Sequence, residues 1–300
     1  MELLQQLWDL LATAILRGGL YALMAVGLSL VFGVMNIANF SHGEFYMIGA
    51  YFAYFGLTVF NLGPLPSIVF AGLIAAIIGV IVERGFFKPL RRKSKKGWLM
   101  NTFLLTLGIS IIMQNTVRMI WGSQYRGVTQ YWEGRTSLLT NMEVANDRIV
   151  AFCIAMVAIT LLWYFLTYTR TGRAIRAVSQ DETGSSLMGI DLNWIHTLTF
   201  SLSCSLAAIA GASLLSINPA YPTMGVSPLY KSWFVLILVG MGNIWGSIYG
   251  GLIVGLLETI SIYQFGAGWQ DVISLAIIIL ILLFKPSGLF AKKGVKSVLE

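Results

Sequence analysis

Long apolar segments separated by short polar ones dominate this chain of 300 residues. Most of these segments are close to the roughly 20 residues that a helix needs to cross the hydrocarbon core of a membrane. The pattern predicts an all-α, polytopic integral membrane protein with a single transmembrane domain over residues 1–300. The apolar runs fall at about 10–35, 44–60, 66–87, 98–121, 149–168, 194–217, 232–263 and 270–284.

The run at 232–263 is too long for one simple crossing. As a continuous helix it would extend about 48 Å, against a hydrocarbon core of about 30 Å. It contains GMGNIWGSIYGG (240–251), whose glycines weaken helix propensity. We therefore expect a break between two helical pieces and about nine crossings, with eight or ten as alternatives and with broken or re-entrant segments. Broken helices in transporters often line the substrate route.

A polar cluster also interrupts the chain directly after the first run, in NIANFSHGEF (36–45). The short second run that follows is expected to extend about 25 Å, so the cluster is placed as a helix break near the cytoplasmic edge and a candidate inner gate or hinge. The candidate pathway or gate residues are Asn36, Asn39, Ser41, His42, Glu44, Asn218, Gly242, Asn243 and Gly246, with a kink expected at Asn218–Pro219.

Each of these candidates has a structural alternative. His42 and Glu44 can instead pair with each other or with Arg17 or Arg84 in a structural network. The same choice between a structural pairing and a pathway role applies to Glu258, a single charged residue near the end of an apolar run. Rows of small residues at four-residue spacing can serve helix packing, as in Ala25, Ser29 and Gly33 or Ser203, Ala207 and Gly211. The row Gly242, Gly246 and Gly250 lies among too many glycines for simple packing.

Composition and charge agree with a membrane protein and exclude a nucleic-acid binder. Hydrophobic residues make up 57% of the chain and charged residues 11%, against about 25% charged residues in soluble proteins. The net charge of +7 is concentrated in KPLRRKSKK (88–96), RTGRAIR (170–176) and a tail that contains Lys285, Lys292, Lys293 and Lys296. We read the segments near 90 and 172 as short loops, and the positive-inside rule places them and the basic tail in the cytoplasm. The same rule places the charge-balanced loop 122–148 and the N-terminus outside.

No enzyme or metal signature is present. The sequence contains no HExxH or GxSxG motif and no Gly-Lys dipeptide for a Walker A phosphate loop, so no catalytic residue and no metal site are predicted. If the transporter uses ATP, another chain hydrolyses it. Cys153 and Cys204 are expected to be free, buried thiols.

The polar segment TRTGRAIRAVSQDETGSSLMGID (169–191) lies between two apolar runs. Ala174, Ile175 and Val178 form an apolar face at helical spacing, and Asp181 or Glu182 can begin a second short helix. The alternative is a solvated loop whose arginines only follow the positive-inside rule.

Five motifs in a common order give the chain a resemblance to the permease family of ATP-binding-cassette importers for branched-chain amino acids. The chain looks like the shorter of the two permease subunits in that system. The motifs are GGLYALMAVGLSLVFGVMNIANFSHGEFYMIGAY near the start, VERGFFKPLRR, TGRAIRAVSQDETGSSLMGID, GMGNIWGSIYGG and LLFKPSGLF.

The resemblance implies a multi-pass permease of the bacterial inner membrane that works with other subunits. The expected partners are a different, longer permease chain, two cytoplasmic ATPases and an extracytoplasmic solute-binding protein, in a lipid bilayer and without nucleic acid. The chain itself would bind no cofactor, and ATP and Mg²⁺ would be used by the ATPases. The segment that matches the family's ATPase-coupling helix pair contains Gly172, Arg173, Ala174, Arg176, Gln180, Leu187, Met188, Gly189 and Asp191.

Three alternatives remain open from the sequence. A related permease for urea or short amides would share much of the same pattern. An ion-driven secondary transporter would use Glu44 and Glu258 as carriers, and a channel would form around the glycine breaks. The last two would function without an ATPase partner.

Overall fold

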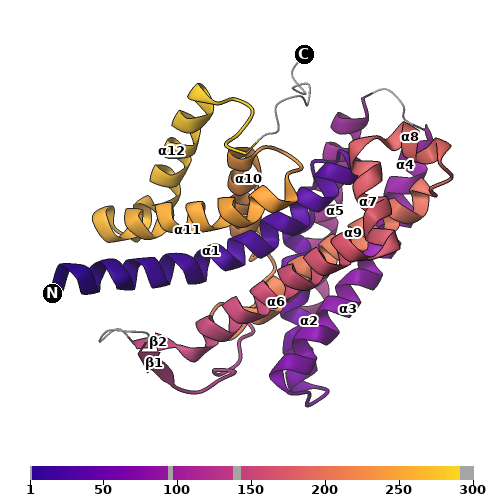
Figure 1. Cartoon of the computed structure of the whole chain (residues 1–300). Helices are drawn as coiled ribbons and strands as arrows, with labels where there is room; N and C mark the ends of the chain where they lie inside the picture. The colour runs from indigo at the N-terminus through magenta and orange to yellow at the C-terminus, as the bar shows by residue number, and fades with distance from the viewer. Residues whose placement is uncertain (1, 94–96, 138–142, 291–300) are drawn as a thin grey trace.

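The computed structural model describes residues 2–93, 97–137 and 143–290, and these are almost entirely helical (Figure 1). The α-helices are α1 (Glu2–Met35), α2 (His42–Thr58), α3 (Pro64–Val82), α4 (Lys88–Lys93), α5 (Trp98–Trp121), α6 (Asn146–Tyr168), α7 (Arg170–Gln180), α8 (Glu182–Leu187), α9 (Leu192–Ser213), α10 (Val226–Val239), α11 (Ile244–Phe265) and α12 (Gln270–Phe284). A π-helical turn, η1 (Glu83–Phe87), joins α3 to α4, and a 3₁₀ turn, η2 (Ala267–Trp269), precedes α12.

Within the described residues, seven helical segments are long and apolar enough to cross a membrane, which confirms a polytopic all-α membrane protein. Two apolar helices are shorter: α2 has 17 residues and α10 has 14. The run at 232–263 is divided as expected, because α10 ends at Val239 and α11 begins at Ile244.

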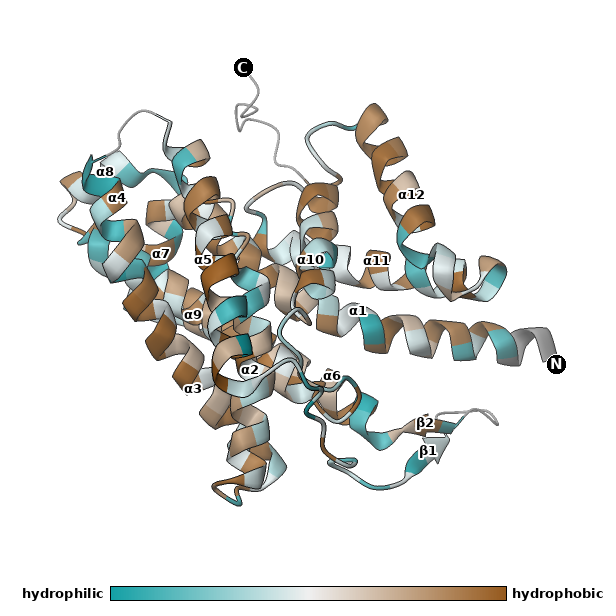
Figure 2. Ribbon diagram, turned by 180° about the vertical axis from the view of Figure 1, so that it is seen from behind, coloured by the Kyte–Doolittle hydropathy of each residue, from teal (hydrophilic) through white to brown (hydrophobic). Residues whose placement is uncertain are grey.

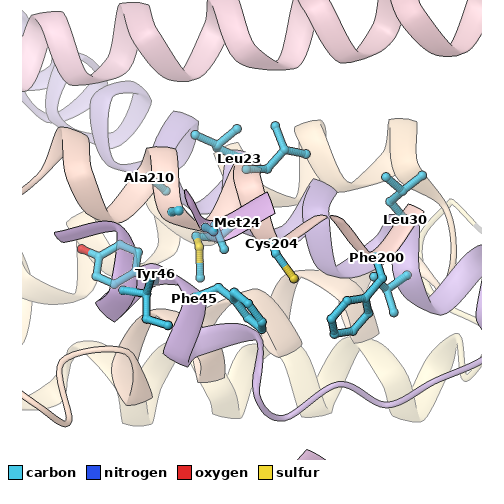
Figure 3. Packing of buried hydrophobic residues seen from close by; sticks show 14 of the residues in the cluster. Leu23, Met24, Leu30, Phe45, Tyr46, Phe200, Cys204 and Ala210 are labelled. Atoms are coloured by element: carbon cyan, nitrogen blue, oxygen red, sulfur yellow. The ribbon is translucent and has the colours of Figure 1, made fainter. Parts of the chain in front are cut away.

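The centre of the molecule is formed by α1, α2 and α9. Helix α9 packs against α2 and α3, while α1 packs along α11 and α9. Buried side chains from α1, α2 and α9, including Leu23, Phe45 and Phe200, meet in this core (Figure 3). By contrast, α5, α6 and α12 leave most of their apolar surface exposed, as expected of helices that face lipid or a partner subunit.

Small residues allow two of the central helix contacts to be very close. A Cβ atom added to Gly211 of α9 would lie 2.0 Å from the carbonyl oxygen of Tyr46 in α2. A Cβ atom on Gly255 of α11 would lie 2.6 Å from the Cα atom of Gly18 in α1. In lipid the hydrophobic effect does not drive helices together, so close packing of this kind stabilises their association instead. The packing role of the row that ends at Gly211 is therefore confirmed.

Three expectations about local structure need correction. The basic segment at 88–96 is not a loop up to Lys93, because α3 continues through η1 into α4; residues 94–96 lie outside the described residues. The loop 122–148 contains a short antiparallel hairpin, β1 (Arg135–Ser137) and β2 (Glu143–Ala145), and α6 begins at Asn146. Cys204 is buried as expected, whereas Cys153 lies on the exposed face of α6.

The polar segments gather at two opposite ends of the molecule. The basic helices α4 and α7 lie with α8 at one end, and the β1–β2 hairpin lies at the other, near the start of α1 (Figures 1 and 2). The two basic segments are therefore on the same side, as the charge pattern predicts. The tail residues Lys292, Lys293 and Lys296 lie outside the described residues.

Candidate functional site

A cavity of about 750 Å³ lies at the hairpin end of the molecule. Its walls come from α1, α2, the segment between α9 and α10, α10 itself, the hairpin and the start of α12. This volume lies within the roughly 300–1,000 Å³ that is usual for small-molecule sites. Its polar lining residues include Arg17, Tyr21, Tyr46, Asn218, Lys231 and Gln270.

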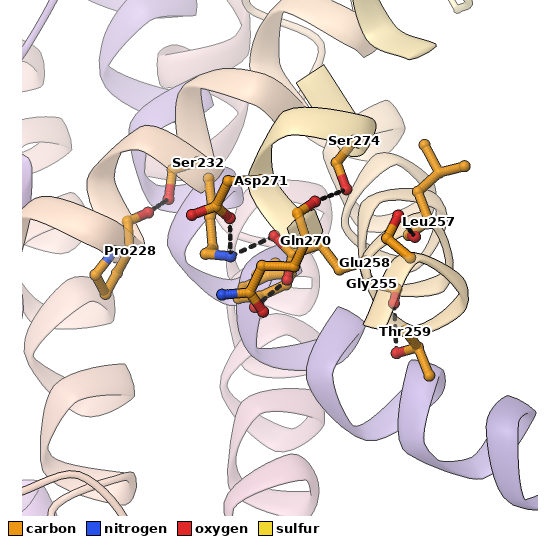
Figure 4. Close-up of polar contacts among 12 residues, drawn as sticks. Pro228, Ser232, Gly255, Leu257, Glu258, Thr259, Gln270, Asp271 and Ser274 are labelled. Atoms are coloured by element: carbon orange, nitrogen blue, oxygen red, sulfur yellow. Dashed lines mark hydrogen bonds and ion pairs between the residues drawn. The ribbon is translucent and has the colours of Figure 1, made fainter. Parts of the chain in front are cut away.

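A buried charge cluster stands beside this cavity. Lys231, in the second turn of α10, is ion-paired with Glu258 of α11 and places its Nζ atom 2.9 Å from Oδ1 of Asp271 in α12. The hydroxyl of Tyr21 in α1 donates a hydrogen bond of 2.6 Å to Oε2 of Glu258. Figure 4 shows Glu258 and Asp271 converging from their two helices. The cluster links α1, α10, α11 and α12, and it gives Glu258 the structural pairing that was one of its two expected roles.

Asn218 is the predicted pathway residue that lines the 750 Å³ cavity. Helix α9 ends at Ser213, and the backbone N–H of Asn218 donates to the carbonyl oxygen of Leu214 at 2.7 Å. Asn218–Pro219 therefore lies after the end of α9, in a turn and not within a helix. The next residue, Ala220, pairs with Arg126 through two backbone hydrogen bonds of 2.9 and 2.8 Å, which fixes the segment against the predicted outer loop.

The polar break after α1 is a turn that is held by its own residues and by α5, because the backbone N–H of Phe40 donates to the hydroxyl of Thr106 at 3.1 Å. Asn36 has a left-handed backbone with φ of 51°, a conformation that Asn tolerates better than most residues. Oδ1 of Asn39 accepts hydrogen bonds from the backbone N–H of Ser41 at 3.1 Å and from its hydroxyl at 2.7 Å. The predicted break is therefore present. The side chains of Asn39 and Ser41 bond to each other within it, while Nδ2 of Asn39 has no hydrogen-bond partner among the described residues.

His42 and Glu44 have partners that the sequence did not suggest. The Nε2 atom of His42 lies 3.1 Å from the carbonyl oxygen of Met24, and its Nδ1 atom lies 3.3 Å from the hydroxyl of Ser203. Oε1 of Glu44 accepts from Ser110 at 2.8 Å and from Gln114 at 2.7 Å. These bonds attach α2 to α1, α9 and α5, and the pairings suggested with Arg17, Arg84 or each other are wrong.

The glycine break between α10 and α11 is a capped turn. Gly240 and Gly242 have φ of 105° and 83°, which side chains with a Cβ rarely adopt. Oδ1 of Asn243 accepts from the backbone N–H of Gly246 at 3.0 Å and so caps α11, while its Nδ2 atom donates to the carbonyl oxygen of Phe290 at 2.9 Å. The break packs against Gly33 at the end of α1, and its residues do not line the 750 Å³ cavity.

The segment 169–191 forms the predicted pair of short helices. The hydroxyl of Thr169 caps α7 through the N–H of Gly172, and the carboxylate of Asp181 caps α8 through the N–H of Gly184, each at 2.9 Å. Ile175 and Val178 are buried against the rest of the molecule. The prediction that the second helix begins at Asp181 or Glu182 is confirmed.

The predicted coupling residues of this pair fall into two groups. Gly172 lies inward, because a Cβ atom there would be 2.1 Å from the carbonyl oxygen of Phe165; Ala174 and Arg176 are half-buried. The end of α8 is strongly exposed, and Leu187 and Met188 each retain 84% of their accessible surface. Arg173, Gln180, Gly189 and Asp191 are also exposed, and Asp191 caps α9.

A second buried acid, which sequence reasoning missed, lies near this helix pair. Glu83 accepts from Nη2 of Arg91 at 2.9 Å and from the hydroxyl of Thr197 at 2.6 Å, which joins η1, α4 and α9. Nε2 of His196 in α9 lies 3.7 Å from Oε1 of Glu182 in α8. The sequence does hold a signal for such residues, because an ionisable group in or beside an apolar run usually requires a partner. Glu83 and Lys231 both stand at such positions.

The fold defines a multi-pass integral membrane protein, and comparison with known proteins gives its family. A family model described as "Branched-chain amino acid transport system / permease component" matches residues 10–282, and the chain belongs to this family. The chain is thus a permease component of a multi-subunit transport system, located in bacteria in the inner membrane. The resemblance inferred from the five motifs is confirmed.

Individual relatives agree with the family. The high-affinity branched-chain amino acid transport system permease protein BraD of Pseudomonas aeruginosa is 31% identical over 94% of each chain. The corresponding permease LivH of Escherichia coli is 31% identical over 98% of this chain and 97% of its own. The ribose import permease RbsC of Escherichia coli is more distant, at 26% identity over 87% of this chain and 81% of its own. These relatives do not favour the urea, amide or ion-driven alternatives.

Proposed function

We propose that this chain forms part of the translocation path for branched-chain amino acids in an ATP-binding-cassette importer. Its partners would be a second, longer permease, two cytoplasmic ATPases that use ATP and Mg²⁺, and an extracytoplasmic binding protein. The chain would bind no cofactor and catalyse no reaction of its own. Family membership and the relatives named as branched-chain amino acid permeases support this assignment.

The observation that carries the proposal is the exposed apolar end of α8. Leu187 and Met188 project from a short helix at the basic end of the molecule, opposite the hairpin. Leu187 and Met188 are adjacent and have polar neighbours, and a contiguous exposed apolar patch with a polar rim is a mark of contact with another protein. Such a contact suits the groove of a cytoplasmic ATPase, the partner that the family resemblance supplies.

The contacts of α7 and α8 would let a movement of α8 pass to the membrane helices. Helix α7 is held by its buried residues Ile175 and Val178, and α8 is connected to α9 through the backbone at Gly189 and the contact between Glu182 and His196. A push on α8 would therefore reach α9, one of the three central helices. Movement of a packed helix of this kind is a usual way to switch a helix bundle between two arrangements.

The path itself would begin in the 750 Å³ cavity. Its lining combines polar groups with Leu20, Met24, Leu214 and Met224, which suits a zwitterion with an apolar side chain. In this proposal the breaks at 36–44 and 240–246 are hinges at which the deeper part of the path opens, because each joins two helices through a short non-helical turn.

The experiment replaces Leu187 and Met188 together with Asp in the complete importer. We expect the ATPases to dissociate during purification and ATP-driven leucine uptake into proteoliposomes to fall by at least about tenfold, since two apolar contacts are replaced by desolvated charges. The matched control exchanges the two residues, Leu187→Met with Met188→Leu, which keeps the exposed apolar surface.

The control variant should retain the ATPases and at least about half of the uptake, because swaps of similar volume between Leu and Met are well tolerated. Normal uptake by the double Asp variant would refute the docking role of α8. A wild-type complex that hydrolyses ATP without importing leucine, isoleucine or valine would refute the substrate assignment.

A further inference from the structure

Arg17 occupies an unusual position in α1. It lines the 750 Å³ cavity and also a neighbouring cavity of about 280 Å³ between α1 and α11. It is the one charged residue between Leu10 and Met35, and its side chain is half-buried. A cation at such a place within an apolar helix is costly and is usually retained for a purpose.

The other basic residues around the 750 Å³ cavity are already compensated or solvated. Lys231 is paired with Glu258 and Asp271, Arg135 lies 3.6 Å from Glu143, and Arg148 is exposed. Among the salt bridges of residues 6–93, 97–137 and 143–290, none involves Arg17.

Acids near Arg17 do not provide such a pair. Asp9, which lines the smaller cavity, is eight residues earlier in α1, or about 12 Å along the helix axis. Glu258 is bonded to Tyr21 and Lys231. Arg17 is therefore a half-buried cation that lines the cavity, and a bound anionic group could balance its charge.

The residues that follow Arg17 on α1 indicate how a ligand would be oriented in the cavity. Arg17, Leu20, Tyr21 and Met24 are spaced along one face of α1, and all four line the cavity. Moving deeper along this face, a guanidinium is followed by apolar side chains. A branched-chain amino acid has the same arrangement, with a carboxylate at one end and an aliphatic group at the other.

We propose that Arg17 is a binding residue for the carboxylate of the transported amino acid, in a subsite of the 750 Å³ cavity. The aliphatic side chain would lie against Leu20 and Met24, and Asn218 and Tyr46 would face the substrate from the other walls. A guanidinium can hold a carboxylate through two parallel hydrogen bonds. This inference rests on the proposed function, because it takes the substrate class from it.

The test measures direct binding by the purified permease–ATPase complex in nanodiscs, without the binding protein. Saturation-transfer difference NMR would follow leucine and leucinamide, an analogue that lacks the carboxylate. The variants are Arg17→Met and Arg17→Lys, with Arg118→Met as a matched control, since Arg118 is an exposed cation at the end of α5 away from the cavity. Retention of the ATPases on size exclusion shows that each variant is folded.

We expect Arg17→Met to weaken leucine binding by at least about tenfold, or ~1.4 kcal/mol, while leucinamide binding stays the same. Arg17→Lys should lie between, and Arg118→Met should match the wild type. Equal leucine binding by Arg17→Met and the wild type, equal response to leucine and leucinamide in the wild type, or no detectable leucine binding would each overturn the subsite.

Uptake by the reconstituted importer with its binding protein separates the two proposals. If the wild type and Arg17→Met both import leucine at the same rate, the subsite is refuted and the proposed function stands. If the wild type imports no branched-chain amino acid, the proposed function itself is refuted.

Discussion

Two buried glutamates in the apolar helices, Glu258 and Glu44, have very different surroundings. Glu258 exposes 0% of its surface to solvent and Glu44 exposes 1%, so the two residues do not differ in burial. Glu258 meets a lysine, whose own side chain is nearly buried, and a tyrosine hydroxyl. Glu44 meets only neutral donors, Ser110 and Gln114, and its Oε2 atom has no hydrogen-bond partner among the described residues.

The difference shows that a carboxyl group in an apolar helix can have two structural uses. At Glu258 the charge is compensated. The pair with Lys231 joins α10 to α11 at the wall of the cavity, and the hydrogen bond from Tyr21 adds the distant helix α1. At Glu44 the group serves as a hydrogen-bond acceptor between α2 and α5. Glu83 is intermediate, since its cation Arg91 is one-fifth exposed and its other partner is the neutral Thr197. Replacement of each Glu with Gln compares the three at constant shape.

The largest effect is expected for Glu258→Gln. Lys231 would remain buried with Asp271, which is more than half exposed, as its remaining acidic partner. Breaking a buried ion pair by removing one partner typically costs about 3–5 kcal/mol, and the contact to Asp271 favours the lower end. SDS titration of the purified permease in detergent micelles, followed by circular dichroism, would measure the loss in free energy of unfolding.

A double substitution serves as the control for Glu258→Gln. Lys231→Met together with Glu258→Gln removes both charges, so we expect it to recover at least about half of the lost stability, which is the sign of direct coupling between neighbours. Additive losses from the two single variants would mean that the ion pair contributes no coupling and that the contrast with Glu44 is not one of charge.

A smaller effect is expected for Glu83→Gln, about 1–2 kcal/mol in the same titration. The glutamine can still accept from Thr197 and Arg91, and the arginine is partly solvated, so less charge is left uncompensated. Arg91→Met is the companion variant, because it leaves the fully buried Glu83 without its cation. If Glu83→Gln cost as much as Glu258→Gln, the exposure of the cation would not be the deciding factor.

Features that depend on neighbouring residues were predictable from the sequence. The break at 240–243 follows from closely spaced glycines in a run too long for one crossing, and the α7–α8 pair follows from helical spacing and from Asp181 as a cap. Each of these signals acts over a few residues. The structure adds only details, such as the bond from Asn243 to Phe290.

Features that depend on distant residues were not predictable. The pairing of Glu258 with Lys231 spans 27 residues and a helix break, and the pairing of Glu44 with Gln114 spans 70. The cavity draws its walls from helices and a hairpin that are separated along the chain, so of the predicted pathway residues only Asn218 could be recognised on it afterwards. The continuation of α3 through η1 and α4 to Lys93 was missed because a run of cations suggests a loop. In the structure, Arg91 of this run forms an ion pair with Glu83.

The smallest effect is expected for Glu44→Gln, which tests the neutral side of the comparison. The glutamine carbonyl oxygen can accept the same two hydrogen bonds from Ser110 and Gln114, and the second oxygen has no partner to lose, so the free energy of unfolding should change by less than about 1 kcal/mol. Leucine uptake by the reconstituted importer should also be retained. Gln114→Leu is the control, since it removes a donor and should destabilise more than Glu44→Gln. If Glu44→Gln abolished uptake while stability stayed unchanged, the carboxyl group would take part in transport as the ion-driven alternative requires, and Glu44 would no longer be a structural counterpart of Glu258.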